Sequence, residues 1–204
     1  MLKINDKTYR LSKSQYTSSY NNKTQIILVN SFSEHMNHFK GWSIREGGDY
    51  QKTTPYSVDI YGNVYEHYPP EFHSKLFNIS EIDKHLISIT IENEGWLEKE
   101  IDGNRFINYI GNIYNRKDSV VNRKWRGKEY WAPYTAPQLT ATIELCKYLL
   151  ITYGIDKKVV SDNTVLDGAY NFNGVLFKSN YEKFYSDLSP AWDYETFKNK
   201  IEEI

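Results

Sequence analysis

The chain of 204 residues has a single cysteine, Cys146, and no apolar run long enough to cross a bilayer. One cysteine excludes an internal disulfide and cannot supply the several thiolates of a structural zinc site. A membrane span needs roughly 20 consecutive apolar residues, so we expect no membrane insertion. No apolar stretch follows the first basic residues, so no secretory signal is visible. We therefore expect synthesis in the cytoplasm, with association with a virion or release by lysis as the routes outward.

The sequence also lacks an excess of charge of either sign. Lys and Arg number 25 and Asp and Glu number 26, which gives a formal net charge of −1. Without surplus cations a protein releases few counterions from a phosphate backbone, so we expect no nucleic-acid partner. Repeats, low-complexity tracts and linkers rich in proline or glycine are missing too. The sequence therefore predicts a polar arm over residues 1–24 and one domain over residues 25–204.

Aromatic residues are abundant, at 16% of the chain, and 18 of them are tyrosines. Half-buried tyrosines suit strands, whereas exposed ones suit flat ligands such as sugars. Residues 95–134 hold Trp96, Trp125 and Trp131 among many charged side chains. This segment is too polar for a core and too aromatic for a disordered linker. We expect a folded surface excursion that borders a groove.

Several strands are predicted from apolar runs. Residues 25–29 form a continuous apolar run, which is typical of a strand buried on both faces. Residues 56–60 and 64–68 flank a short connection containing Gly62, which indicates a hairpin. Residues 86–92 alternate, so three isoleucines share one face while Ser88, Thr90 and Glu92 share the other. That polar face is expected to be the floor of a site. Shorter strands are expected at 7–11 and 157–160.

Helices are predicted from caps and spacing. Thr135 and Gln138 fit a capping box, and apolar residues then recur at helical spacing as far as a glycine cap at Gly154. Cys146 lies on that apolar stripe and is expected to be packed. Further helices are predicted over 33–42 and 195–204. Because strands and helices alternate, we predict a single α/β domain with a mixed central sheet flanked by helices.

The order of these segments resembles one known family. The relevant segments are 23–32 (KTQIILVNSF), the hairpin at 56–68, 71–74 (EFHS), 89–95 (ITIENEG), 125–131 (WRGKEYW), 134–138 (YTAPQ), 160–163 (VSDN) and 185–192 (YSDLSPAW). Together they cover roughly residues 16–197. They resemble the type 2 N-acetylmuramoyl-L-alanine amidases, the family of phage amidase-type lysozymes and peptidoglycan-recognition proteins. The resemblance implies the amidase type 2 fold.

The resemblance also implies a zinc site held by two histidines and an aspartate or cysteine, with a glutamate that assists as base. The first ligand position falls on Val29, which has no lone pair, and the other two fall on Asp162 and Asp187. The glutamate matches Glu92, in the family's general-base position. Two carboxylates without an imidazole make a weak zinc site, so we expect no bound cofactor. The inherited groove would be lined by Asn30, His73, Glu92, Asp162, Tyr185 and Asp187.

Several of these residues have alternative interpretations. His35 and His38, three residues apart on the predicted helix, could bind a metal together, but no third ligand is apparent. His73 could contact substrate or make a structural hydrogen bond. Asp162 and Asp187 are expected to be close, and two uncompensated carboxylates repel. One of them should bind a cation, find a lysine or arginine, or have a raised pKa.

Three functions are compatible with these residues. The first is an amidase-fold pseudoenzyme of phage or lysis-related origin that has lost its zinc and recognises peptidoglycan fragments or a protein partner. The second is an active cell-wall amidase with a rearranged metal site, in which Asp162 and Asp187 meet a third donor such as His73 or Asn30. The third is a scaffold that binds only protein, with residues 125–131 as its interface; alternatively those aromatics pack on the body as a lid.

Overall fold

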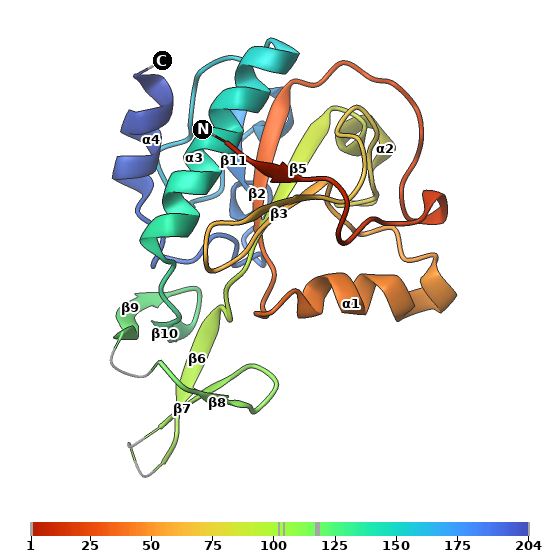
Figure 1. Ribbon diagram of the computed structural model, residues 1–204. Coiled ribbons are helices and arrows are strands. Elements are labelled where there is room, and N and C mark those ends of the chain that lie inside the picture. Colours follow the sequence, from red (N-terminus) through yellow and green to blue (C-terminus); the bar gives the residue numbers. More distant parts are fainter. Residues whose placement is uncertain (1, 102, 104, 117–118, 204) are drawn as a thin grey trace.

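A six-stranded sheet forms the centre of the computed structural model, which describes residues 2–101, 103, 105–116 and 119–203 (Figure 1). Its strands are β1 (Ile4–Asn5), β2 (Gln25–Asn30), β3 (Tyr56–Val58), β4 (Val64–Glu66), β5 (Leu86–Ile91) and β11 (Gly174–Phe177), in the order β1-β4-β3-β5-β2-β11. Only the β3–β4 hairpin is antiparallel; the other neighbours are parallel. The predicted mixed sheet of an α/β domain is therefore confirmed.

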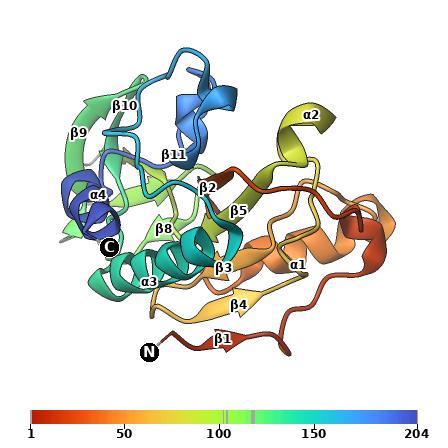
Figure 2. The same cartoon turned by 90° about the horizontal axis from the view of Figure 1, so that it is seen from above.

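Helices cover both faces of this sheet (Figure 2). Helix α3 (Ala136–Tyr153) and helix α4 (Tyr194–Glu202) pack on one face, and Cys146 of α3 is fully buried in the core there, as predicted. Helix α1 (Asn37–Ile44) lies on the opposite face, where His38 bonds to Ser57 of β3. Helix α2 (Ser80–Asp83) is a short turn that precedes β5. Among the described residues, none of the helices has the length and apolarity that a bilayer crossing requires.

Helix α3 begins and ends where its sequence predicts. The Thr135 hydroxyl accepts a bond from the Gln138 amide (3.2 Å), and the Gln138 side chain accepts one from the Thr135 amide (3.0 Å). Gly154 closes the helix with φ +63°, a left-handed conformation that glycine adopts without steric cost. Gln138 also donates to the carbonyl of Glu92 (2.6 Å). The amino terminus of α3 is thus bonded to the end of β5.

The polar face of β5 is not an open floor, contrary to the prediction. Ser88, Thr90 and Glu92 are all buried, and the chain between β2 and β3 contacts both Thr90 and Glu92. The Thr90 hydroxyl is bonded to that of Thr54 (2.9 Å). Alternation correctly separated the two faces of the strand, but it could not show that this polar face is also packed.

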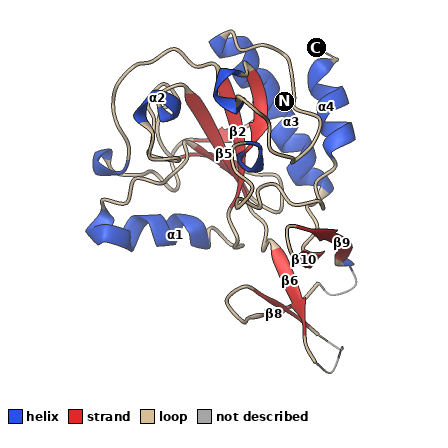
Figure 3. Cartoon of the chain, turned by 180° about the vertical axis from the view of Figure 1, so that it is seen from behind, coloured by secondary structure: helices blue, strands red, loops and turns tan. Residues whose placement is uncertain are grey.

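A second, antiparallel sheet projects beyond the carboxyl ends of the central strands (Figures 1 and 3). We call residues 96–131 the insert. Its strands are β6 (Trp96–Lys99), β7 (Phe106–Asn108), β8 (Ile113–Tyr114), β9 (Val121–Trp125) and β10 (Lys128–Trp131), in the order β8-β7-β6-β10-β9. Leu97, Tyr114 and Ala132 form a small separate core beneath it. The insert lies within the excursion expected at 95–134.

Some predicted boundaries are wrong. The strand expected at 7–11 is instead β1, which pairs with β4, while Leu11 packs with Tyr16 in a separate cluster. Residues 157–160 form no strand; one bridge joins Val159 to Val175. The helix expected at 33–42 begins only at Asn37, because the residues before it are left-handed. The carboxyl-terminal helix expected at 195–204 spans Tyr194–Glu202, and residue 204 lies outside the described residues.

Candidate functional site

Three of the predicted site residues lie together at the carboxyl end of the central sheet. Strands β3, β5 and β2 end level, because Val58, Ile91 and Asn30 are in register. Glu92 follows directly after β5. The amide of Asn30 donates to Oδ1 of Asp187 (2.6 Å), which joins β2 to the carboxyl-terminal segment. This is the end of a parallel sheet at which ligand sites usually form.

The clustered side chains are closed off from solvent. The exposed fraction is 7% for Asn30, 1% for Glu92 and 4% for Asp187. Val29 is 5% exposed, and its register with Thr90 and Ser57 places it on the face of the sheet that carries Glu92. The first ligand position of the resemblance is therefore an aliphatic side chain inside the core.

Asp162 lies at the surface and makes local hydrogen bonds. Its Oδ1 accepts bonds from the amide (2.8 Å) and hydroxyl (2.6 Å) of Thr164. These bonds hold the pKa of Asp162 below its usual value. The segment does approach Asp187, since the Asn163 side chain donates to the carbonyl of Leu188 (3.0 Å). The two chain segments are neighbours, but one carboxylate caps an exposed turn while the other is buried.

Asp187 is a fully buried carboxyl group with positive charges nearby. Burial raises its pKa, and the charges of Lys178 and Arg126 and the amide of Asn30 oppose that rise. Tyr185, two residues earlier, is half-buried, and the Lys178 ammonium lies 4.3 Å from its ring centroid. Burial raises the pKa of this phenol as well.

His73 belongs to a different part of the molecule. Its backbone pairs with Thr17, and the preceding Phe72 accepts a bond from Lys23 (3.0 Å), two residues before β2 begins. This is the amino end of the strand whose carboxyl end carries Asn30. His73 lines a cavity of about 230 Å³ there with Asp83 and four other residues. The structure therefore does not bring His73 to Glu92 and Asp187.

The residues in the ligand positions do not fit a zinc ion. Val29 offers no donor atom and the Asp162 carboxylate caps a turn, so Asp187 alone of the three offers a buried donor atom at the cluster. In the described part of the chain, no three His, Cys, Asp or Glu side chains are grouped as metal ligands would be. His35 is exposed whereas His38 is buried, so these two do not converge either. Zinc sites normally rely on imidazole and thiolate, and none of the three positions 29, 162 and 187 carries either group.

A buried chain of polar side chains lies beside Glu92, and sequence reasoning missed it. The Nδ1 of His38 is 3.7 Å from Oε1 of Glu92, and its Nε2 is 2.8 Å from the Ser57 hydroxyl. That hydroxyl is 2.7 Å from Nε2 of His67, whose Nδ1 is 2.7 Å from the carbonyl of Tyr9. The available signal was that Ser57 and His67 lie on opposite arms of the predicted hairpin, where their side chains can meet. No signal in the sequence indicated that α1 would contribute His38 to this chain.

The direction of these bonds follows from the one fixed acceptor. The Tyr9 carbonyl can only accept, so His67 carries its proton on Nδ1 and accepts from Ser57 on Nε2. Ser57 then accepts from Nε2 of His38, which leaves His38 Nδ1 as a lone pair facing Glu92. Burial lowers the pKa of His38 to about 3 and that of His67 to about 4, so both imidazoles are neutral at pH 7.

Glu92 is suited to hold a proton opposite that lone pair. Burial raises its pKa to about 7, and the negative charges of Asp59 and Glu34 add to the rise. The amide of Met36 donates to Oε1 and opposes it. A carboxyl group balanced in this way can give or take a proton near neutral pH.

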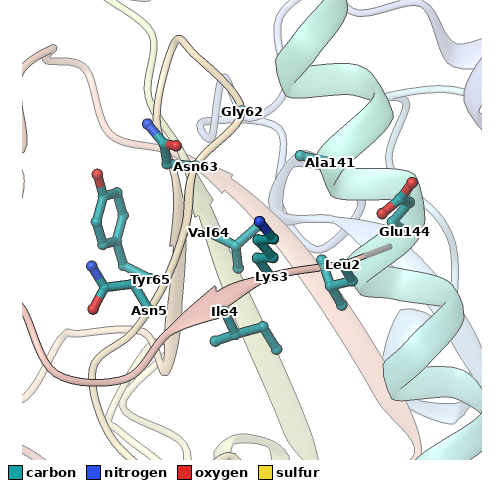
Figure 4. Close-up of a pocket in the computed structure, with 10 residues that line it drawn as sticks. All are labelled: Leu2, Lys3, Ile4, Asn5, Gly62, Asn63, Val64, Tyr65, Ala141 and Glu144. Carbon is teal, nitrogen blue, oxygen red and sulfur yellow. The ribbon is translucent and has the colours of Figure 1, made fainter.

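A further cavity lies away from this cluster. It measures about 500 Å³ and is bounded by β1, the β3–β4 turn and α3, with Lys3, Asn63 and Glu144 at its edge (Figure 4). Leu2, Ile4 and Ala141 form its apolar part. None of the predicted site residues lines it, so this cavity is separate from the cluster around Glu92 and Asp187.

Comparison with known proteins identifies structures with the same fold. No protein-family model and no curated protein matches the sequence. Solved structures do match: the endolysin amidase LysCS from Clostridium intestinale URNW has a TM-score of 0.55, 14% identity and coverage of 98% of this chain and 96% of its own. A mutant endolysin from Bacillus subtilis has a TM-score of 0.56, 13% identity and coverage of 98% and 99%.

A third match is the endolysin of the Thermus scotoductus MAT2119 bacteriophage Ph2119, with a TM-score of 0.53, 14% identity and coverage of 97% of this chain and 98% of its own. All three matches extend over nearly the full length of both chains. The central sheet, its flanking helices and this agreement support one conclusion: the chain has the fold of the type 2 N-acetylmuramoyl-L-alanine amidases.

Proposed function

We propose that this chain is a non-hydrolytic member of the amidase fold that binds peptidoglycan. The observation that carries the proposal is the chemistry of the ligand positions. A buried isopropyl group at Val29 and a turn-capping carboxylate at Asp162 leave only Asp187 in place. The solved amidases of the same fold cleave the bond between muramic acid and L-alanine, as their names state. We infer that this chain keeps their type of ligand without the metal that hydrolysis would use.

An aromatic group on the insert supports a binding role. Tyr109 is 48% exposed and packs edge-on against Phe32, with ring centroids 5.9 Å apart. Trp96 lies 6.3 Å from Tyr109, and the Lys128 ammonium is 3.3 Å from the Trp96 ring centroid. We call Phe32, Trp96 and Tyr109 the aromatic rim. Flat, partly exposed rings with a cation beside them suit the apolar faces and anionic groups of a glycan carrying lactyl peptides.

The rim is held close to the site residues by one glycine. Gly95 has φ +77°, and a Cβ at this position would lie 2.5 Å from the Phe32 ring. The conformation and the close approach both require glycine. Because Gly95 is three residues after Glu92, the rim borders the carboxyl end of the sheet.

Two measurements on the purified protein test the proposal. Sedimentation with insoluble peptidoglycan measures binding, and release of muramic-acid-linked peptides from the same material measures hydrolysis. We expect co-sedimentation without peptide release, and weaker binding for Tyr109→Ala. The matched control is Tyr20→Ala, which removes an exposed tyrosine beside Phe72, far from the rim.

Each other outcome identifies a different function. Peptide release that a chelator abolishes would show a rearranged metal site and an active amidase. Glu92 would then be the first candidate for the base, because its pKa is already near 7. Protein that stays in the supernatant would overturn peptidoglycan binding and leave a protein-binding scaffold.

A further inference from the structure

Arg126 extends from the insert into the body of the molecule. It lies in the turn between β9 and β10, where its own φ is +46° and Gly127 follows with φ +76°. The side chain is half-buried although the turn is at the tip of a hairpin, and its guanidinium lies 4.4 Å from the Trp125 ring centroid. The turn thus directs the guanidinium toward the carboxyl-terminal segments.

The guanidinium is bonded to four backbone carbonyls. Nη1 donates to Glu182 (3.0 Å) and to Tyr185, and Nη2 donates to Ser179 (3.0 Å) and Asn163 (3.3 Å). A planar cation with five donors in a fixed fork is the side chain that can satisfy several acceptors at once. A surface arginine normally makes few such bonds, so this set of carbonyls is a formed binding site.

The four carbonyls come from the two segments that carry the remaining ligand positions. Asn163 is adjacent to Asp162. Ser179 also donates its amide to the carbonyl of Asp187 (2.7 Å), and Tyr185 lies two residues before Asp187. The guanidinium therefore lies between these segments, and its charge adds to the larger effect of Lys178 on the buried Asp187 carboxyl.

We propose that the carbonyls of Asn163, Ser179, Glu182 and Tyr185 form a guanidinium-binding site, which Arg126 fills from the insert. The bound cation fixes the insert to the carboxyl-terminal segments and, together with Lys178, balances the charge of Asp187. The site is specific for a planar, forked cation rather than for positive charge in general. This assignment goes beyond peptidoglycan binding and depends only on the contacts described.

Chemical rescue tests the specificity of the site. Arg126→Ala vacates it, and we expect amide hydrogen exchange over 161–164 and 178–188 to accelerate by about tenfold or more. Millimolar methylguanidinium should restore protection in this variant, whereas methylammonium should not. The matched control is Arg123→Ala, an exposed arginine on the same hairpin, in which exchange should match the wild type. Unchanged exchange in Arg126→Ala, or no selective rescue, would overturn the site.

A double-mutant cycle tests the charge balance independently of the rescue. The variants are Arg126→Gln, Asp187→Asn and the double variant, each unfolded with denaturant. Asn at 187 can still accept the amide of Asn30, so it removes the charge and keeps the shape. We expect the double variant to be destabilised about tenfold less, as an unfolding constant, than the two single effects multiplied together. Independent effects would show that Arg126 does not balance Asp187.

Discussion

Two buried carboxyl groups at the same end of the sheet have opposite surroundings. Glu92 faces the lone pair of a neutral imidazole and two negative side chains, and its pKa is raised to about 7. Asp187 is also buried, which raises its pKa, but the charge of Lys178, the amide of Asn30 and the charge of Arg126 act against that rise. A buried carboxyl group can be accommodated by a proton or by a nearby cation, and this fold uses one solution on each side of β2.

The largest expected effect comes from breaking the polar chain beside Glu92. Ser57→Ala removes the hydroxyl that joins His38 to His67 and leaves two buried ring nitrogens without a partner. At ~1–3 kcal/mol for each unsatisfied group, we expect the free energy of unfolding to fall by about 4 kcal/mol. Denaturant titration measures the change. Ser43→Ala, at an exposed serine of α1, should stay within about 0.5 kcal/mol of the wild type.

A difference in pH response is the next largest effect. Glu92 titrates near 4.5 in the unfolded chain and near 7 in the folded one. Between these values the folded chain holds a proton that the unfolded chain has lost. Its contribution to stability is therefore complete below pH 4.5 and is lost as the pH rises through 7.

Glu92→Gln cannot titrate, so its stability relative to the wild type should rise by about 3 kcal/mol from pH 4.5 to 8. His38 and His67 have lowered pKa values and act in the opposite direction below pH 6.5, but they do so in both proteins and cancel in the difference. Denaturant titrations across this range test it, with the exposed Glu98→Gln as the control. A difference that does not vary with pH would contradict the raised pKa of Glu92.

Arg126→Lys sharpens the comparison on the Asp187 side. Lysine keeps the positive charge but loses the fork that reaches four carbonyls, so the free energy of unfolding should fall by about 2 kcal/mol. Thermal and denaturant unfolding measure the loss, with Lys124→Arg on the same hairpin as the control. A neutral result would mean that charge alone holds the insert in place.

The smallest expected effect is a gain of zinc affinity. Val29→His with Asp162→His places two imidazoles in the positions that the resemblance assigns to metal ligands, with Asp187 as the third donor. We expect an increase of about tenfold in zinc affinity by calorimetry, because the residue at 162 must first leave the turn that Asp162 caps. The single variant Val29→His should show little gain. No increase in the double variant would contradict the assignment of these positions.

Local signals in the sequence predicted much of the fold. The apolar run of β2, the alternation of β5 and the capping box of α3 each depend on neighbouring residues, and each was correct. The late start of α1 was not predictable in this way. Phe32, His35 and Met36 adopt positive φ angles although none of them is glycine, so only tertiary contacts can impose that conformation.

The site was less predictable because its contacts join distant parts of the chain. Asn30, Glu92 and Asp187 were expected to lie together, and the structure places them at one end of the sheet. Their burial could not be predicted in this way, because it depends on how α1 and the insert pack against the end of the sheet. The bonds of Arg126 join residues more than 35 positions apart. The sequence indicated only that Asp162 or Asp187 would bind a cation, meet a lysine or arginine, or have a raised pKa. Composition and spacing carry no information about which arginine that is.

The two ends of the insert are joined where it leaves the body. The amide of Ala132 donates to the carbonyl of Gly95 (2.9 Å), and the Asn93 side chain is bonded to the carbonyls of Ala132 and Pro133. The path from β5 to α3 is therefore closed before the insert begins. Whatever lies between Gly95 and Ala132 can be lengthened, shortened or exchanged without moving the strand relative to the helix. The insert is thus a separate lobe on a closed scaffold, and its own strands do not set the distance between β5 and α3.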